Sequence, residues 1–332
     1  MPAYPIQTTR TFPDPLLHAY RQQGDPPADA LLDTLIQRQG PTALRTLMPW
    51  LTTGKQTGDM PFPDLLAPFF EQHRELPAWA DPVRMKQGMA VFAQHSRAAS
   101  LILGCFSLPY CYLGADGAQV LWLTERIRHD TTRRLQETGE WLFAVMDPKN
   151  WRTTEAVDRT LRVRLIHAAS RWFAQQHPEW NMAWGLPVNQ EDMAGTNLAF
   201  SYIVLLGLRE MGIRLSRDEE EAYQHHVNVV GYLNGVSEAL LPQNLREAFQ
   251  LGRAIARRQF KASEAGAGLT RALLQAIAKQ VNTPDSWNLA AGEMRFFLGD
   301  AYADMLGIPA IPLGKRVAGV VNRLPLFQTG LL

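Results

Sequence analysis

Apolar residues in this chain recur at intervals of three and four from about residue 31 to residue 305, and they almost never alternate with polar ones. The first spacing predicts helices that bury one face, whereas alternation over a short stretch would predict strands. No strand–helix–strand rhythm interrupts the pattern. The sequence therefore predicts an all-α fold.

Proline and glycine divide the pattern into segments. We expect helices at about 117–146, 152–176, 190–211, 217–233, 243–259, 269–280 and 287–305. Residues 1–30 are rich in Pro, Gln and Asp and predict an N-terminal arm, followed by a single helical domain over 31–310. Residues 311–332 mix basic and apolar side chains and predict a C-terminal strap on the core. Contact of this strap with a membrane surface, or with a second copy in a homodimer, is the alternative.

The most apolar window, residues 98–115, is interrupted by Gly104 and Pro109. It is shorter than the roughly 20 residues that a helix needs to cross a bilayer. We expect a buried, kinked core helix here and no transmembrane segment. The N-terminus lacks a basic stretch followed by an apolar one, so we expect no export signal and a cytoplasmic protein.

Several function classes are disfavoured by what the sequence lacks. The formal charge is +1, from 33 basic and 32 acidic side chains, which predicts no nucleic-acid partner. Cys105 and Cys111 have neither disulfide-framework nor zinc-site spacing and are interpreted as buried small residues. No GxSxG, P-loop, GxGxxG or HExxH motif is present, which disfavours hydrolase, nucleotide-binding and zinc-enzyme functions.

The stretch "GLPVNQEDMAGTNLAF" (185–200) is interpreted as the start of a helix. Asn189 is a good N-cap, and Asp192, three residues later, can return a hydrogen bond. Capping therefore accounts for these side chains without chemistry.

One histidine of the helix expected at 152–176 stands out. Leu161 and Leu165 mark the stripe that this helix should bury, and His167 lies off that stripe, between Arg164 and Arg171. Two guanidinium groups beside an imidazole lower its pKa. A neutral imidazole is the form that binds iron or copper.

The two arginines would suit carboxylates such as haem propionates, because their planar forks match that geometry. On spacing alone, an ordinary surface or hydrogen-bonded helix histidine is the simpler interpretation of His167, since most histidines hold no metal.

Within residues 130–146, Arg134 and Thr138 share one helix face with Thr131 and Leu142. They are four residues apart and therefore meet side by side. Burying an unpaired cation there would cost several kcal/mol. The pair either has partners on other helices or faces a polar ligand, and the pattern leaves both possibilities open.

Three stretches together resemble the latex-clearing (rubber) oxygenase and mycophenolic-acid (MpaB-type) oxygenase family. They are "RRLQET" (133–138), "RVRLIHAASR" (162–171) and "GLPVNQEDMAGTNLAFSYIVLLGLREMG" (185–212), and the similarity extends over about residues 75–305. The resemblance implies an all-helical protein with a globin-like core that encloses a haem b pocket. Members of the family cleave carbon–carbon double bonds of isoprenoid chains with dioxygen, which gives carbonyl products.

The resemblance assigns roles to individual residues. His167 matches the proximal iron ligand, and Arg134 and Thr138 match the Arg and Thr of the distal R-x-x-K-T pattern. The lysine of that pattern is Glu137 here, so a lysine-capped closed state is not expected. We interpret Glu137 as a candidate catalytic base, provided that burial raises its pKa.

Arg162, Arg164 and Arg171 are the candidates for holding haem propionates.

The expected function is a haem b-dependent oxygenase that uses O2 on a C=C bond of a hydrophobic isoprenoid- or lipid-like molecule. Apolar residues of 98–113 and 198–208 would line the substrate site. A small terpenoid or unsaturated lipid fits an unexported protein better than a long polymer does. A haem-binding sensor or carrier without catalysis is the alternative, and a helical scaffold without a cofactor is a third possibility.

Overall fold

The computed structural model describes residues 9–54, 59–123, 126–281 and 285–310, and the expected strap at 311–332 lies outside this part. Within it the secondary structure is helical, apart from one isolated β-bridge between Gly114 and Phe260. The all-α prediction is confirmed.

The helices follow one another with short connections. The first are α1 (Asp14–Arg21), α2 (Pro26–Gln39), α3 (Ala43–Thr53), α4 (Pro63–His73), α5 (Pro82–Gln94) and α6 (Ser96–Ile102). Then come the π-helical turn η2 (Leu103–Ser107), α7 (Leu108–Leu113), α8 (Ala115–Leu123), α9 (Arg126–Met146) and α10 (Glu155–Gln175). The last are η3 (Met182–Trp184), α11 (Gln190–Phe200), α12 (Tyr202–Glu210), α13 (Arg217–Leu233), η4 (Glu238–Leu240), α14 (Leu245–Gln259), α15 (Glu264–Val281) and α16 (Ser286–Met305).

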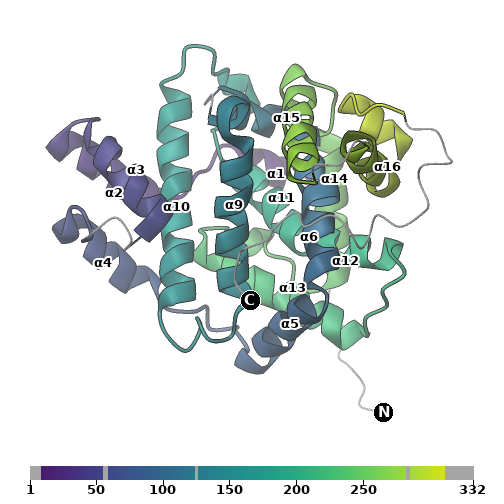
Figure 1. Ribbon diagram of the computed structural model, residues 1–332. Helices are drawn as coiled ribbons and strands as arrows, with labels where there is room; N and C mark the ends of the chain where they lie inside the picture. The colour runs from purple at the N-terminus through teal and green to yellow at the C-terminus, as the bar shows by residue number, and fades with distance from the viewer. Residues whose placement is uncertain (1–8, 55–58, 124–125, 282–284, 311–332) are drawn as a thin grey trace.

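Helices α9 and α10 pack side by side in the middle of the molecule (Figure 1). Helices α2, α3 and α4 lie on one side of α10, and α15 and α16 lie on the side of α9 away from it (Figure 1). Two large apolar clusters result, one among α6, η2, α9, α12, α13, α15 and α16, and one between α10 and α2–α4. Each of the two central helices therefore has an apolar face fixed by a separate core.

The apolar window at 98–115 is a buried and irregular helical segment, as predicted. It consists of α6, the π-helical turn η2 and α7, and residues Leu101, Cys105 and Leu113 are almost fully buried. Pro109 has no N–H to donate to the preceding turn, so a regular α-helix cannot continue through it. No helix in the described ranges combines the length and the hydropathy that a membrane span requires.

Part of the N-terminal arm expected at 1–30 is helical. Helix α1 lies inside it, and α2 begins at Pro26 rather than near residue 31. Both helices have proline in the first turn, where the missing N–H costs nothing. Proline, which in the sequence indicated a loose arm, therefore marks two helix starts.

Two of the other expected helices are divided. The segment 117–146 forms α8 and α9, and the segment 190–211 is broken at Ser201, whose φ is −110° and ψ is −85°. The predicted cap is confirmed: Asn189 accepts a hydrogen bond from the Asp192 N–H at the start of α11. Asp81 caps the start of α5 in the same way.

Candidate functional site

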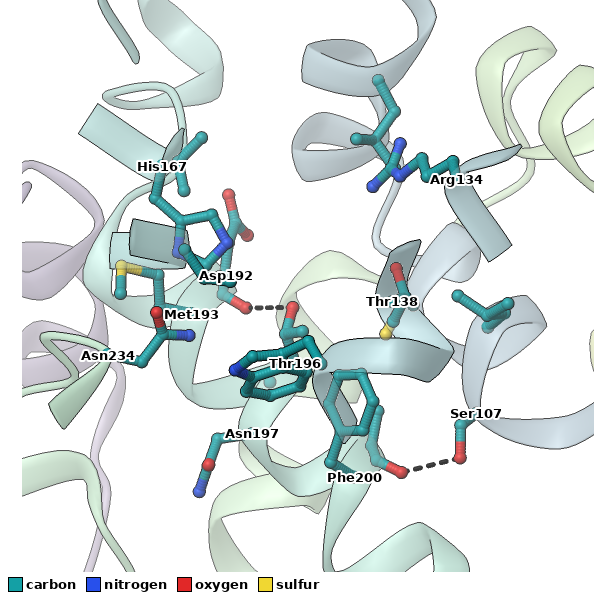
Figure 2. Close-up of a pocket in the computed structure, with 18 of the residues that line it drawn as sticks. Ser107, Arg134, Thr138, His167, Asp192, Met193, Thr196, Asn197, Phe200 and Asn234 are labelled. Atoms are coloured by element: carbon teal, nitrogen blue, oxygen red, sulfur yellow. Dashed lines mark hydrogen bonds between the residues drawn. The ribbon is translucent and has the colours of Figure 1, made fainter. Parts of the chain in front are cut away.

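A cavity of about 790 Å³ lies between α9, α10, α11 and α13. Its volume is within the range of roughly 300–1,000 Å³ that small-molecule and cofactor sites occupy. Its wall is mostly apolar, with Leu103, Leu108, Leu142, Ile166 and Phe200 among the lining residues. A limited set of polar side chains enters this apolar space, and His167, Arg134 and Thr138 belong to that set (Figure 2).

Helix α10 places His167 in the cavity wall because Leu161 and Leu165, on its neighbouring face, are fully buried against α2–α4. Burial, together with the nearby positive charge of Arg171, lowers the pKa of His167 to about 4. The imidazole is therefore neutral at neutral pH. Its Nδ1 atom is buried and has no hydrogen-bond partner.

The expected propionate role of Arg164 and Arg171 is not what the structure shows. Both Arg164 Nε and Nη2 donate to the carboxylate of Asp25, at 2.5 and 2.8 Å, and both side chains are buried. Arg171 Nε donates to Asp29 Oδ1 at 2.7 Å. The arginine forks do bind carboxylates, but these carboxylates belong to the N-terminal segment of the same chain.

Arg162, the third arginine, lies differently. It lines the cavity, and its guanidinium carbon lies 5.9 Å from the centre of the Trp50 ring. Gly54 makes room for it, since a Cβ on Gly54 would lie 2.5 Å from Arg162 Nη1. Among the three arginines, Arg162 remains the candidate for an anionic group of a ligand.

Arg134 and Thr138 lie across the cavity from His167 (Figure 2). Thr138 is half-buried, whereas Arg134 is exposed, so the buried cation that the sequence suggested is instead at the edge of the site. Leu142 continues the same face of α9 along the cavity wall. The expected face of α9 therefore does line the site.

Glu137 also lines the cavity, at its edge. Its side chain is 34% exposed and forms an ion pair of 2.9 Å with Arg133, one helical turn earlier. The burial that the catalytic-base interpretation required is therefore not observed.

The sequence analysis missed the role of an acid in the cavity wall. Asp192 lines the cavity, and burial raises its pKa although Arg21 lies beside it. Its Oδ1 accepts from Arg21 Nη1 at 2.8 Å, and its Oδ2 accepts from Asn189 Nδ2 at 2.7 Å. Helix capping accounted for Asp192 from the local sequence alone. Nothing in the local sequence indicated that Arg21 on α1 would be its partner.

The described residues contain no group of three or more His, Cys, Asp or Glu side chains that could hold a metal ion. A metal at His167 would take a single imidazole from this part of the chain.

Comparison with known proteins identifies the family. Residues 94–325, more than half of the chain, match the family described as "ER-bound oxygenase mpaB/B'/Rubber oxygenase, catalytic domain". The chain belongs to this oxygenase family. The match includes the parts of α9, α10 and α11 that line the cavity.

Two relatives support the assignment to the oxygenase family. The rubber oxygenase of Streptomyces sp. (strain K30) is 25% identical over 329 residues, which cover 93% of this chain and 76% of the relative. The structure described as latex clearing protein LCP in the closed state has a TM-score of 0.75 at 22% identity. That similarity covers 89% of this chain and 80% of the other, and it shows a shared fold.

Proposed function

We propose that this member of the oxygenase family is a haem b-dependent enzyme that uses O2 to cleave or oxidise a C=C bond of a hydrophobic isoprenoid- or lipid-like molecule. The observation that carries the proposal is a neutral histidine, His167, in the wall of an apolar cavity of about 790 Å³. Arg134 and Thr138 on the opposite wall add hydrogen-bond donors where oxygen chemistry needs them (Figure 2).

The residues present fit a haem. Nδ1 of His167 is buried in the wall, although the residue as a whole is only half-buried. Nε2, the other ring nitrogen, is therefore the atom that would bind iron. Arg162 at the cavity wall would pair with a propionate. When bound, the haem would supply the iron centre at which dioxygen is activated.

The protein's own contribution is positioning, exclusion of water and charge stabilisation. The Thr138 hydroxyl and the Arg134 guanidinium would stabilise negative charge that develops on the side of the cavity opposite His167. The leucine and phenylalanine side chains of the wall would bind the substrate chain and exclude water. This arrangement suits a substrate without charge along its length.

Proton transfer has two candidate carboxylates in this site. Glu137 lies at the cavity edge and is paired with Arg133, whereas Asp192 lies within the wall and its pKa is raised by burial. If Glu137 is the base, Glu137→Gln should abolish turnover while Asp192→Asn retains it. The reverse result would identify Asp192 as the base.

The substrate that we propose is a small terpenoid or an unsaturated lipid rather than a polymer, because the haem and the substrate would have to share one cavity of about 790 Å³. The test is oxygen uptake by the purified protein with short isoprenoids and with latex, combined with mass spectrometry of the products. Oxygen uptake with carbonyl products from the short substrates supports the proposal. A haem-containing protein that consumes no oxygen with any of them would instead be a sensor or carrier.

The cytoplasmic location, the homodimer and the peripheral membrane contact stay predictions.

A further inference from the structure

Two buried polar atoms in the wall beside His167 lack hydrogen-bond partners. One is Nδ1 of His167 and the other is Oδ1 of Asn234, and both residues line the cavity. Figure 2 shows Asn234 on the same wall as His167, across from Arg134 and Thr138. A buried polar atom without a partner costs about 1–3 kcal/mol, so two of them in one wall require an explanation.

The backbone around Asn234 is held close to the helix that carries His167. A Cβ on Gly235 would lie 2.2 Å from Asp25 Oδ2 and 2.8 Å from Arg164 Nε, and Arg164 is one helical turn before His167. The Asn234 N–H donates to Val230 O at 2.9 Å, and Gly235 O accepts from Gln190 Nε2 at 2.9 Å. The backbone is thus tied on both sides, and the amide of Asn234 is the part that can turn.

The two atoms are complementary in chemistry. A histidine that binds a metal through Nε2 carries its proton on Nδ1, which then needs an acceptor. The carbonyl oxygen of an asparagine side chain is such an acceptor. Oδ1 of Asn234 is buried in the wall and unused, so it can accept that proton once the two side chains adjust.

We propose that Asn234 is a positioning residue for His167: its Oδ1 accepts a hydrogen bond from Nδ1–H and so fixes the tautomer that presents Nε2 to iron. This inference rests on the proposed haem-dependent function. It adds a residue with no direct contact to iron, which sets the orientation and the basicity of the ligand. Such partners typically change metal affinity by about 10–100-fold.

The test uses the full chain with haem and four variants: Asn234→Leu, which has similar volume but no acceptor, Asn234→Asp, His167→Ala and a control. The control is Asn197→Leu, which removes another cavity-lining amide whose Nδ2 already donates to Asn228 Oδ1 at 3.1 Å. The readouts are the rate of haem loss to a scavenger protein and the iron–histidine stretching frequency of the reduced protein by resonance Raman spectroscopy.

We expect Asn234→Leu to lose haem about 10–100-fold faster and to lower the stretching frequency. Asn234→Asp should raise the frequency above wild type, because a charged acceptor strengthens the hydrogen bond. Asn197→Leu should leave the frequency unchanged, since its amide lies away from the histidine (Figure 2).

If Asn234→Leu keeps the wild-type stretching frequency and rate of haem loss, the inference is overturned. If His167→Ala loses haem in the same experiment, the proposed function still stands. If Asn234→Leu does not fold, an unchanged frequency in Asn234→Asp overturns the inference equally. A wild-type chain that binds no haem would refute the proposed function and this inference together.

Discussion

Removal of Asp25 tests whether Arg164 anchors the N-terminal segment, as the structure shows, rather than binding a cofactor. The Asp25 and Arg164 side chains are 3% and 11% exposed, and two hydrogen bonds of 2.5 and 2.8 Å join them. Asp25 makes no side-chain cap at the start of α2, so Asp25→Ala removes the ion pair without removing a helix cap.

The expected loss follows from the burial of the pair. Removing one partner of a buried ion pair typically costs about 3–5 kcal/mol, because the other charge is left without compensation. The Glu155–Arg159 pair is the matched control: its side chains are 43% and 34% exposed, so Glu155→Ala should cost less than about 1 kcal/mol. The difference between the two variants therefore reports burial and not merely charge.

The assay is urea unfolding of the haem-free chain, followed by circular dichroism. Asp25→Ala should lower the free energy of unfolding by about 3 kcal/mol or more. The double variant with Arg164→Met should be more stable than Asp25→Ala alone, since it removes the orphaned charge. If Asp25→Ala is no more destabilising than Glu155→Ala, the buried pair does not anchor the N-terminal segment, and the argument is refuted.

Three further predictions concern pH, the propionate site and Asp192 in the cavity wall. The pKa values of His226 and His167 are both lowered to about 4, chiefly by burial. Between pH 6.5 and pH 4 the unfolded chain therefore binds more protons than the folded chain, and the free energy of unfolding falls as the pH falls. Each histidine should lower the free energy of unfolding at pH 5 by about 2 kcal/mol relative to pH 7.5. In urea titrations at the two pH values, the pH-dependent loss should therefore be about 2 kcal/mol smaller in His226→Gln than in the wild type. Arg162→Leu should weaken haem binding about tenfold, or by about 1.4 kcal/mol, in a titration of the haem-free chain. An unchanged affinity would show that Arg162 does not bind a propionate. Gly117→Ala places a Cβ 2.9 Å from the carboxylate of Asp192, so it should lower stability by about 1–3 kcal/mol and reduce turnover, whereas full stability would show that the site adapts.

The parts of the fold that the sequence predicted are those with local signals. Helix α13 was expected at 217–233 and spans Arg217–Leu233, because a capping box of Ser216 and Glu219 marks its start and the apolar spacing is regular. Helix α1 was missed because its eight residues begin at an Asp–Pro pair that resembles a loop. Local rules identify long, capped helices and fail on short ones.

In the site, too, local sequence patterns predicted some features and missed those that depend on distant residues. The cavity face of α9 and the position of His167 off the buried stripe of α10 followed from helical spacing. The partners of Arg164 and Arg171 did not, because Asp25 and Asp29 are 139 and 142 residues away in the chain. Asp192 was recognised only as a capping residue, since Arg21, which holds it in the wall, is 171 residues away.

The most direct test of the proposed function is the absorption spectrum of the purified wild-type chain beside that of His167→Ala. If the imidazole of His167 holds the haem iron, the wild-type protein shows a Soret band, and His167→Ala loses it while keeping its helical circular dichroism. A wild-type protein without the band after incubation with haem, or an unchanged band in His167→Ala, would contradict the haem site proposed for this oxygenase-family chain.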